Sequence, residues 1–377
     1  MAEMKISAIA AWFGGKRTMA PLIVQQLGIK FKQYFEPFCG SMAVLFAMEQ
    51  RGFETVNDLH GDLINLASIL QSPLAHQLYD RAMRTLVCED LLEKAESILA
   101  EPVDADPYFV PIDRAYWYFV ATWMGRNGVA GTAATDYQMA VRWTPNGGSP
   151  ATRFRSCVES IPAWHDRLRN VVILRRDAFD IIPKFDDAEH TAIYVDPPYP
   201  AESRGGGKGV GGHAGTYLYE FSHDSLYGDD HERLAKILRE FKHARIVVST
   251  YDCPRYRELY AGWTFIDCAR MKNLHQQNGR GQRSKVAPEV LIVNGPEYLK
   301  DHLHMAKQPE PPEAAPRTRL VNRNEHLRAA SRIVAILEDV DPAKWAGILK
   351  IVQESLANPE AVNGEVTPQA LFAAEAK

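Results

Sequence analysis

The sequence predicts an α/β fold in which a parallel β-sheet is covered by helices. Short runs rich in β-branched and aromatic residues alternate with helix-patterned segments, and they lie at 33–38, 55–57, 171–174, 192–195, 244–249, 264–267 and 289–293. Such alternation is typical of sheets whose strands are connected by helices. Ligands of open α/β sheets bind beyond the carboxyl ends of the strands. Acidic residues follow several of these runs, so we expect a binding site at that edge.

The composition is that of a large protein with an uneven distribution of charge. The chain has 377 residues, of which 46% are hydrophobic, so it can bury at least one sizeable core. Its net charge of −4 does not indicate a nucleic-acid partner. Residues 114–176, however, carry nine arginines against three acids, and residues 242–285 carry nine basic residues against three acids. These segments either line a cationic groove or form solvated helix faces.

Cysteine usage and hydropathy exclude several classes of protein. The five cysteines lie far apart without a Cys-x-x-Cys pair, so we expect neither a disulfide framework nor a metal site. The apolar stretch near the N-terminus is too short for a signal peptide, and no run approaches membrane-spanning length. We therefore expect a cytoplasmic protein with no membrane partner.

The first two strand-like runs end next to carboxylates. Glu36-Pro37-Phe38 closes the run at 33–38, and Asp58 follows the run at 55–57. Residues 74–165 then interrupt the alternation with a helical pattern, an aromatic-rich stretch and a segment rich in glycine and proline. This stretch is too long for an ordinary crossover and indicates an inserted subdomain.

The run at 192–195 ends in the most informative motif of the chain, Asp196-Pro197-Pro198-Tyr199. Each proline fixes φ and removes a backbone donor, so the strand end is held rigid. The Asp196 carboxylate and the Pro197 carbonyl can accept two N–H bonds from a planar amine, while the Tyr199 ring can stack on its face. The motif thus predicts a binding site for an aromatic group that carries an exocyclic NH₂.

Two further segments differ from the α/β body. Residues 203–215 contain seven glycines, which indicates a flexible lid beside the Asp196-Pro197-Pro198-Tyr199 motif. Residues 308–316 resemble a proline-rich linker, and 324–337 and 343–356 have the pattern of two amphipathic helices. Because two short helices bury little alone, we expect them to dock on the body or to mediate self-association.

Four motifs follow one another along the chain: WFGGK at 12–16, FEPFCGS at 35–41, NDL at 57–59 and DPPY at 196–199. Together they resemble the D12 class of DNA N6-adenine methyltransferases, which contains the Dam enzymes, in the α-type motif order. The resemblance implies a Rossmann-like sheet that binds S-adenosylmethionine, with 1–73 and 166–300 as the catalytic core. It also implies that the mainly helical insertion at 74–165 is a target-recognition domain for double-stranded DNA. A linker at 301–320 and a helical extension at 321–377 complete this division.

The resemblance assigns a set of residues to the cofactor, namely Trp12, Lys16, Glu36, Phe38, Gly40, Asp58, Asp177 and Asp196. Asp58 is the expected partner of the ribose hydroxyls, since a carboxylate offers two acceptors to a vicinal diol. Lys16 is expected to pair with the cofactor carboxylate. Asp177 could accept the cofactor's adenine amine or simply cap a helix. Met42 stands where many relatives have a second glycine, and we expect its side chain to turn into the core.

Asp196, Pro197 and Tyr199 are the residues expected to hold the target base, which must leave the duplex for its amine to be reached. A second set is expected to contact DNA: Arg126, Asn127, Gln138, Arg142, Arg153 and Arg155 on the insertion, and Arg280 and Lys285 beyond it. For any single arginine, solvent exposure without a partner is the competing interpretation.

Two alternatives to adenine methylation remain open at this stage. The exocyclic amine at N4 of cytosine would present the same two protons to the motif at 196–199, so cytosine-N4 methylation is one alternative. The other is a non-catalytic DNA-binding protein that retains the fold. The family serves phages, restriction-modification systems and housekeeping methylation, and the sequence does not decide among these roles or reveal the recognition site.

Overall fold

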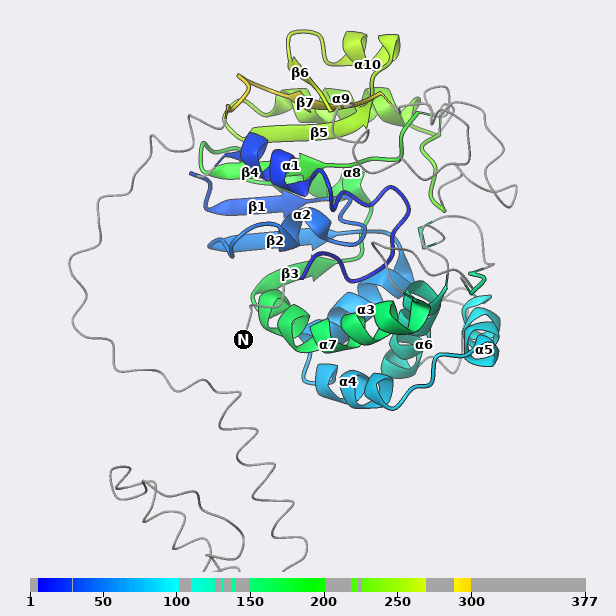
Figure 1. The fold of residues 1–377 in the computed structure, drawn as a ribbon. Coiled ribbons are helices and arrows are strands. Elements are labelled where there is room, and N and C mark those ends of the chain that lie inside the picture. The colour runs from blue at the N-terminus through cyan, green and yellow to red at the C-terminus, as the bar shows by residue number, and fades with distance from the viewer. Residues whose placement is uncertain are drawn as a thin grey trace, which may run out of the picture. The chain divides into compact units, whose positions relative to one another are not determined.

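The computed structural model describes residues 6–28, 30–101, 110–125, 130–131, 137–139, 149–200, 218–222, 226–268 and 288–299. These residues contain one seven-stranded sheet in the order β3-β2-β1-β4-β5-β7-β6 (Figure 1). Its strands are β1 (Gln33–Glu36), β2 (Phe53–Asn57), β3 (Val171–Leu174), β4 (Thr191–Val195), β5 (Arg245–Tyr251), β6 (Thr264–Asp267) and β7 (Glu289–Val293). All the predicted runs form strands, and their ends differ from the prediction by no more than two residues.

The sheet is mixed rather than wholly parallel. β3, β2, β1, β4 and β5 pair in parallel, as expected. β7 is antiparallel to both of its neighbours, β5 and β6, so the expectation of a parallel sheet was wrong for this strand. The short helix α10 (Pro254–Leu259) connects β5 to β6, and these two strands run in the same direction. β7 lies between them in the sheet and runs in the opposite direction.

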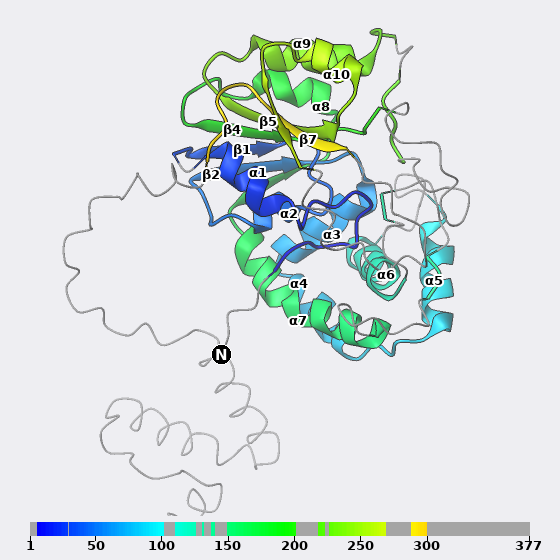
Figure 2. The same ribbon diagram turned by 45° about the horizontal axis from the view of Figure 1, so that its top comes forward.

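Helices cover both faces of the sheet, and alternate residues of each central strand supply the two cores. In β4, Ala192 and Tyr194 join one buried cluster, whereas Ile193 and Val195 join the other. The first cluster includes α1 (Ala20–Leu27) and α2 (Ala43–Phe46); the second includes α8 (Ala178–Ile181), η1 (Ile182–Lys184), α9 (Asp230–Glu240) and α10. Figure 2 shows these two groups on opposite sides of the strands. Burial on both faces explains why central strands such as β4 and β7 are largely apolar rather than alternating.

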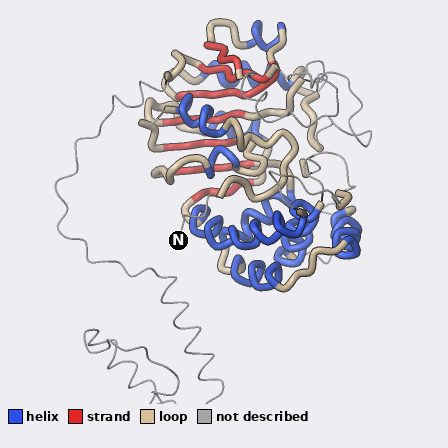
Figure 3. Tube along the Cα trace, in the orientation of Figure 1, coloured by secondary structure: helices blue, strands red, loops and turns tan. Residues whose placement is uncertain are grey.

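Five helices gather beside the β3 edge: α3 (Gly61–Gln71), α4 (Ala75–Met83), α5 (Glu89–Leu99), α6 (Pro111–Met124) and α7 (Pro150–Leu168) (Figure 3). Their apolar residues belong to the same buried cluster as α1 and α2. Two buried ion pairs reinforce the junctions, Arg114 of α6 with Asp62 of α3 and Arg167 of α7 with Glu54 of β2. This part of the predicted insertion therefore shares a continuous core with the sheet.

The predicted glycine lid at 203–215, the linker and the two C-terminal helices lie outside the described residues.

Candidate active site

The carboxyl ends of the parallel strands meet at a cavity of about 430 Å³. This volume is within the range of small-molecule sites. Every residue that the sequence assigned to a cofactor lines it: Trp12, Lys16, Glu36, Phe38, Gly40, Asp58, Asp177 and Asp196. Pro197 lines it as well. The structure thus brings together residues from four strand ends and the N-terminal segment.

Acids outnumber bases among the charged residues that line the cavity. Its carboxylates are those of Glu36, Asp58, Asp177, Asp196, Glu220 and Asp230, whereas its lysine and arginine side chains are those of Lys16 and Arg176. Asp58 and Asp196 are half-buried, so a charge on either carboxylate is screened less than a surface charge. The electrostatic environment favours a ligand that carries a positive charge.

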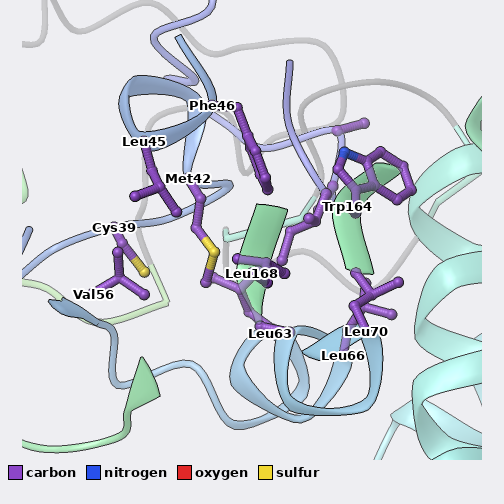
Figure 4. Close-up of a cluster of buried hydrophobic side chains, with 14 of the residues drawn as sticks. Cys39, Met42, Leu45, Phe46, Val56, Leu63, Leu66, Leu70, Trp164 and Leu168 are labelled. Atoms are coloured by element: carbon purple, nitrogen blue, oxygen red, sulfur yellow. The ribbon is translucent and has the colours of Figure 1, made fainter. Parts of the chain in front are cut away.

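The turn after β1 contains an unusual residue in a left-handed conformation. Met42 has φ 61° and ψ 30°, a region in which glycine is the usual choice. Its side chain is fully buried and packs beside Cys39 and Leu45, as Figure 4 shows. The side chain turns into the core, as expected, and the backbone angle gives a physical reason why glycine suits this position.

Trp12 is held between two glycines. A Cβ atom at Gly40 would lie 2.8 Å from the indole Nε1, and one at Gly131 would lie 2.7 Å from the indole ring. A backbone hydrogen bond also connects the two segments, since Phe13 N–H donates to the Ala130 carbonyl at 2.9 Å. Gly40 therefore acts at least in part by accommodating Trp12, which forms one wall of the cavity.

Gly131→Ala should destabilise the protein more than Gly262→Ala. Both glycines have φ near +88° (+87° and +88°), so alanine suffers similar backbone strain at each, but nothing lies within 4 Å of a Cβ at Gly262. We expect Gly131→Ala to cost at least about 1 kcal/mol more in the free energy of unfolding, measured by urea titration, because the Trp12 indole must shift. Equal losses in the two variants would contradict the close packing around Trp12.

Asp58 is positioned by backbone amides on both of its oxygens. Gly40 N–H donates to Oδ2 and His60 N–H donates to Oδ1, each at 2.9 Å. Burial raises the pKa of Asp58, while these amide hydrogen bonds oppose the shift. Each oxygen retains a second lone pair that can accept a hydroxyl.

His60, which the sequence interpretation missed, also lines the cavity. It caps α3, where its Nδ1 accepts the Leu63 N–H at 3.3 Å, and its ring lies 5.3 Å edge-on to Trp12. Burial lowers the pKa of His60, which favours the neutral ring, and with Nδ1 accepting, its proton resides on Nε2. Its place directly before the helix at 61–71 is the only signal that could have indicated it.

Asp196 is held on both sides at the end of β4. Lys16 Nζ lies 2.8 Å from Oδ2, and the Ser249 hydroxyl donates to Oδ1 at 2.7 Å. Because Ser249 has one proton, the Tyr194 hydroxyl must be the donor in its 2.9 Å contact with Ser249. Burial raises the pKa of Asp196, and Lys16 is the main opposing influence. Lys16 thus contacts Asp196 and also lines the cavity, and its pairing with a cofactor carboxylate stays a prediction.

Tyr199 is placed differently from the expectation that its ring stacks on a base. The side chain is buried, its hydroxyl donates to Glu289 Oε1 at 3.0 Å, and its ring packs edge-on against Tyr251. Among the described residues, the cavity lining passes from Pro198 to Leu218 without Tyr199. Glu289, its partner, was not singled out from the sequence, although an acid opening an apolar strand is a recognisable signal.

Glu36 and Asp177 both have structural partners. The Tyr34 hydroxyl donates to Glu36 Oε2 at 2.8 Å, and burial raises the pKa of Glu36 well above its usual value. Asp177 Oδ1 accepts the Phe179 N–H at 2.8 Å and caps α8, as the competing interpretation anticipated. It is nevertheless at the cavity wall, where its other oxygen is available to a ligand.

Three of the residues predicted to contact DNA are described. Gln138 is exposed with φ 27°, and Arg155 is exposed with its guanidinium on the Met83 carbonyl. Arg153 donates to backbone carbonyls at the end of α6, including that of Trp123 at 3.0 Å, so it stabilises that helix end. The remaining residues of the set, Arg126, Asn127, Arg142, Arg280 and Lys285, lie outside the described residues.

Within the described part of the chain, no group of three or more His, Cys, Asp or Glu side chains is arranged to hold a metal ion. The described helices also include none with the length and apolar character needed to cross a membrane.

The N-terminal part of the chain is similar to a known enzyme family. Residues 12–117 match the family model of the D12 class N6 adenine-specific DNA methyltransferases. The matched range begins at Trp12 and includes Lys16, Glu36 and Asp58, all of which line the cavity. The comparison agrees with the motif order and with the α/β sheet, and over residues 12–117 it supports an adenine-specific DNA methyltransferase of the D12 class.

Proposed function

We propose that the protein transfers the methyl group of S-adenosylmethionine to N6 of an adenine that is flipped out of double-stranded DNA at specific sites. The position of Asp196 carries the proposal. Its carboxylate ends β4 at the cavity wall, fixed by Lys16 and Ser249. A rigid acceptor beside a cavity suited to a cation is what methyl transfer to an amine requires.

The residues around the cavity fit S-adenosylmethionine. Asp58 suits the ribose diol, Asp177 can accept the adenine amine of the cofactor, and Trp12 and Phe38 offer apolar surface. The acidic lining suits a ligand with a sulfonium charge. When bound, this cofactor supplies an electrophilic methyl group. On this interpretation the sheet is a Rossmann-like methyltransferase core.

The chemical difficulty lies with the target amine, whose lone pair is delocalised into the adenine ring. Hydrogen bonds from its two protons to the Asp196 carboxylate and the Pro197 carbonyl favour a pyramidal nitrogen with a localised lone pair. Asp196 acts as a positioning acceptor rather than a strong base, because the nitrogen loses its proton readily once alkylated. Placement and electrostatics therefore supply most of the rate enhancement.

Recognition of DNA is proposed for the insertion at 74–165. Exposed Gln138 and Arg155 are the described candidates. We assign Arg153 to the α6 terminus instead, because it donates to the backbone carbonyls of Trp123, Met124 and Gly125.

Incubating the purified protein with methyl-labelled S-adenosylmethionine and mixed-sequence DNA tests the proposal. We expect label in N6-methyladenine after digestion to nucleosides, and long-read sequencing should locate it in one sequence context. Label only in N4-methylcytosine would contradict the adenine assignment, and DNA binding without any transfer would contradict the catalytic one.

Asp58→Asn should weaken S-adenosylmethionine binding by about 10- to 100-fold, the range expected for loss of a charge-assisted hydrogen bond. Calorimetric titration measures this affinity, and melting without cofactor reports any local disturbance, since Asp58 also binds two backbone amides. Asp80→Asn, at an exposed position on α4, is the matched control and should bind as the native protein does. Native affinity in Asp58→Asn would exclude the ribose role.

A further inference from the structure

Glu289 is a buried acid next to the proposed catalytic carboxylate, although it does not line the cavity. It opens β7, the antiparallel strand beside β5, and only 3% of its surface is exposed. Its Oε1 accepts the Tyr199 hydroxyl at 3.0 Å and lies 3.8 Å from Lys16 Nζ. It therefore contacts two residues of the WFGGK and DPPY motifs at once.

Lys16 is shared between two carboxylates. Its Nζ lies 2.8 Å from Asp196 and 3.8 Å from Glu289, and it also donates to the Gly14 carbonyl at 2.7 Å. Lys16 and Glu289 are both shielded from water, with 7% and 3% of their surface exposed. In such surroundings a second carboxylate within 4 Å of an ammonium changes how strongly that ammonium binds the first.

We propose that Glu289 is a positioning residue for methyl transfer, which holds Lys16 and Tyr199 in place and draws part of the Lys16 charge away from Asp196. Asp196 then remains available to accept the protons of the target amine. The inference rests on the proposed role of Asp196 as that acceptor.

The charged groups around Asp196 determine the direction in which each charge variant should shift the pKa of Asp196. After burial, which raises the pKa of Asp196, the largest influence is Lys16, which lowers it, while Glu289 raises it. Glu36 and Tyr194 also face this carboxyl from β1 and from β4 itself. Removing the Glu289 charge should lower the pKa of Asp196, and removing the Lys16 charge should raise it. Since transfer needs ionised Asp196, activity is lost as the pH falls through this pKa.

The test compares pH profiles of methyl transfer by charge variants. Glu289→Gln keeps an acceptor for Tyr199, and we expect kcat to fall about 10- to 100-fold, as for a modest misplacement of reacting groups, with little change in KM for DNA. Its acid limb should move to lower pH. Lys16→Gln should move the acid limb to higher pH. Glu258→Gln, at an exposed position on α10, is the control and should change neither kcat nor the pH at which activity is lost on acidification.

Glu289→Asp provides a second variant that retains the charge, and its acid limb should stay at the native position. Native kcat and an unshifted limb in Glu289→Gln would overturn the inference, as would a loss confined to thermal stability. Absence of methyl transfer by the native protein would instead contradict the proposed function, so the two failures are distinguishable.

Discussion

Asp196→Ala should lower methyl transfer by about 10³-fold or more, the cost typical of removing a group that organises charge in a transition state. The alanine removes the acceptor for the target amine and leaves the Lys16 ammonium without its nearest carboxylate. Because none of the residues proposed to contact DNA phosphates changes, DNA affinity should remain within about two-fold of the native value. Single-turnover transfer and a filter-binding assay measure the two quantities.

Asp186→Ala is the matched control for this variant. Asp186 is exposed and precedes β4, at the end of the strand opposite to Asp196. Its replacement should leave transfer unchanged. Substantial turnover by Asp196→Ala would refute the proposed mechanism at the strand end, whatever the role of the cofactor residues.

Glu54→Ala should lower the free energy of unfolding by about 3–5 kcal/mol, the cost of leaving one member of a buried ion pair unpaired. Glu54 is 1% exposed on β2 and accepts hydrogen bonds from both terminal nitrogens of Arg167, Nη1 at 2.5 Å and Nη2 at 2.8 Å. It also accepts the Arg51 N–H at 2.9 Å. Urea titration followed by circular dichroism measures the loss.

The exposed ion pair of Arg257 and Asp252 serves as the comparison for the buried pair of Glu54 and Arg167. Asp252→Ala there should cost less than about 1 kcal/mol, because a solvated ion pair contributes little to stability. Replacing Glu54 and Arg167 together by leucine should cost much less than Glu54→Ala, since no buried charge is left unpaired. A loss in Glu54→Ala similar to that in Asp252→Ala would show that the α7–β2 junction tolerates a solvated arginine.

Much of the sheet was predictable from local sequence because strand formation depends on short-range pattern. Runs rich in β-branched and aromatic residues identified all the described strands, including β7. The direction of β7 was not predictable, because a hydrophobic run carries no information about which neighbour it pairs with or in which sense.

The composition of the cavity was also predictable, but the contacts within it were not. Acids that end parallel strands converge at one edge for topological reasons, so Glu36, Asp58 and Asp196 could be grouped from the sequence. Whether Lys16 pairs with a ligand or with Asp196, and whether Tyr199 faces the cavity or Glu289, depends on side chains that are distant in the chain.

The sequence alone therefore determined the fold class, the motif order and the acids that follow the parallel strands, since these depend on local pattern and strand order. Only the tertiary structure decided that Glu289 lies against Lys16 and Tyr199, and that Gly40 and Gly131 enclose Trp12. These contacts arise from packing between segments far apart in the chain, where the available space and the cost of burying an unpaired charge select the partner.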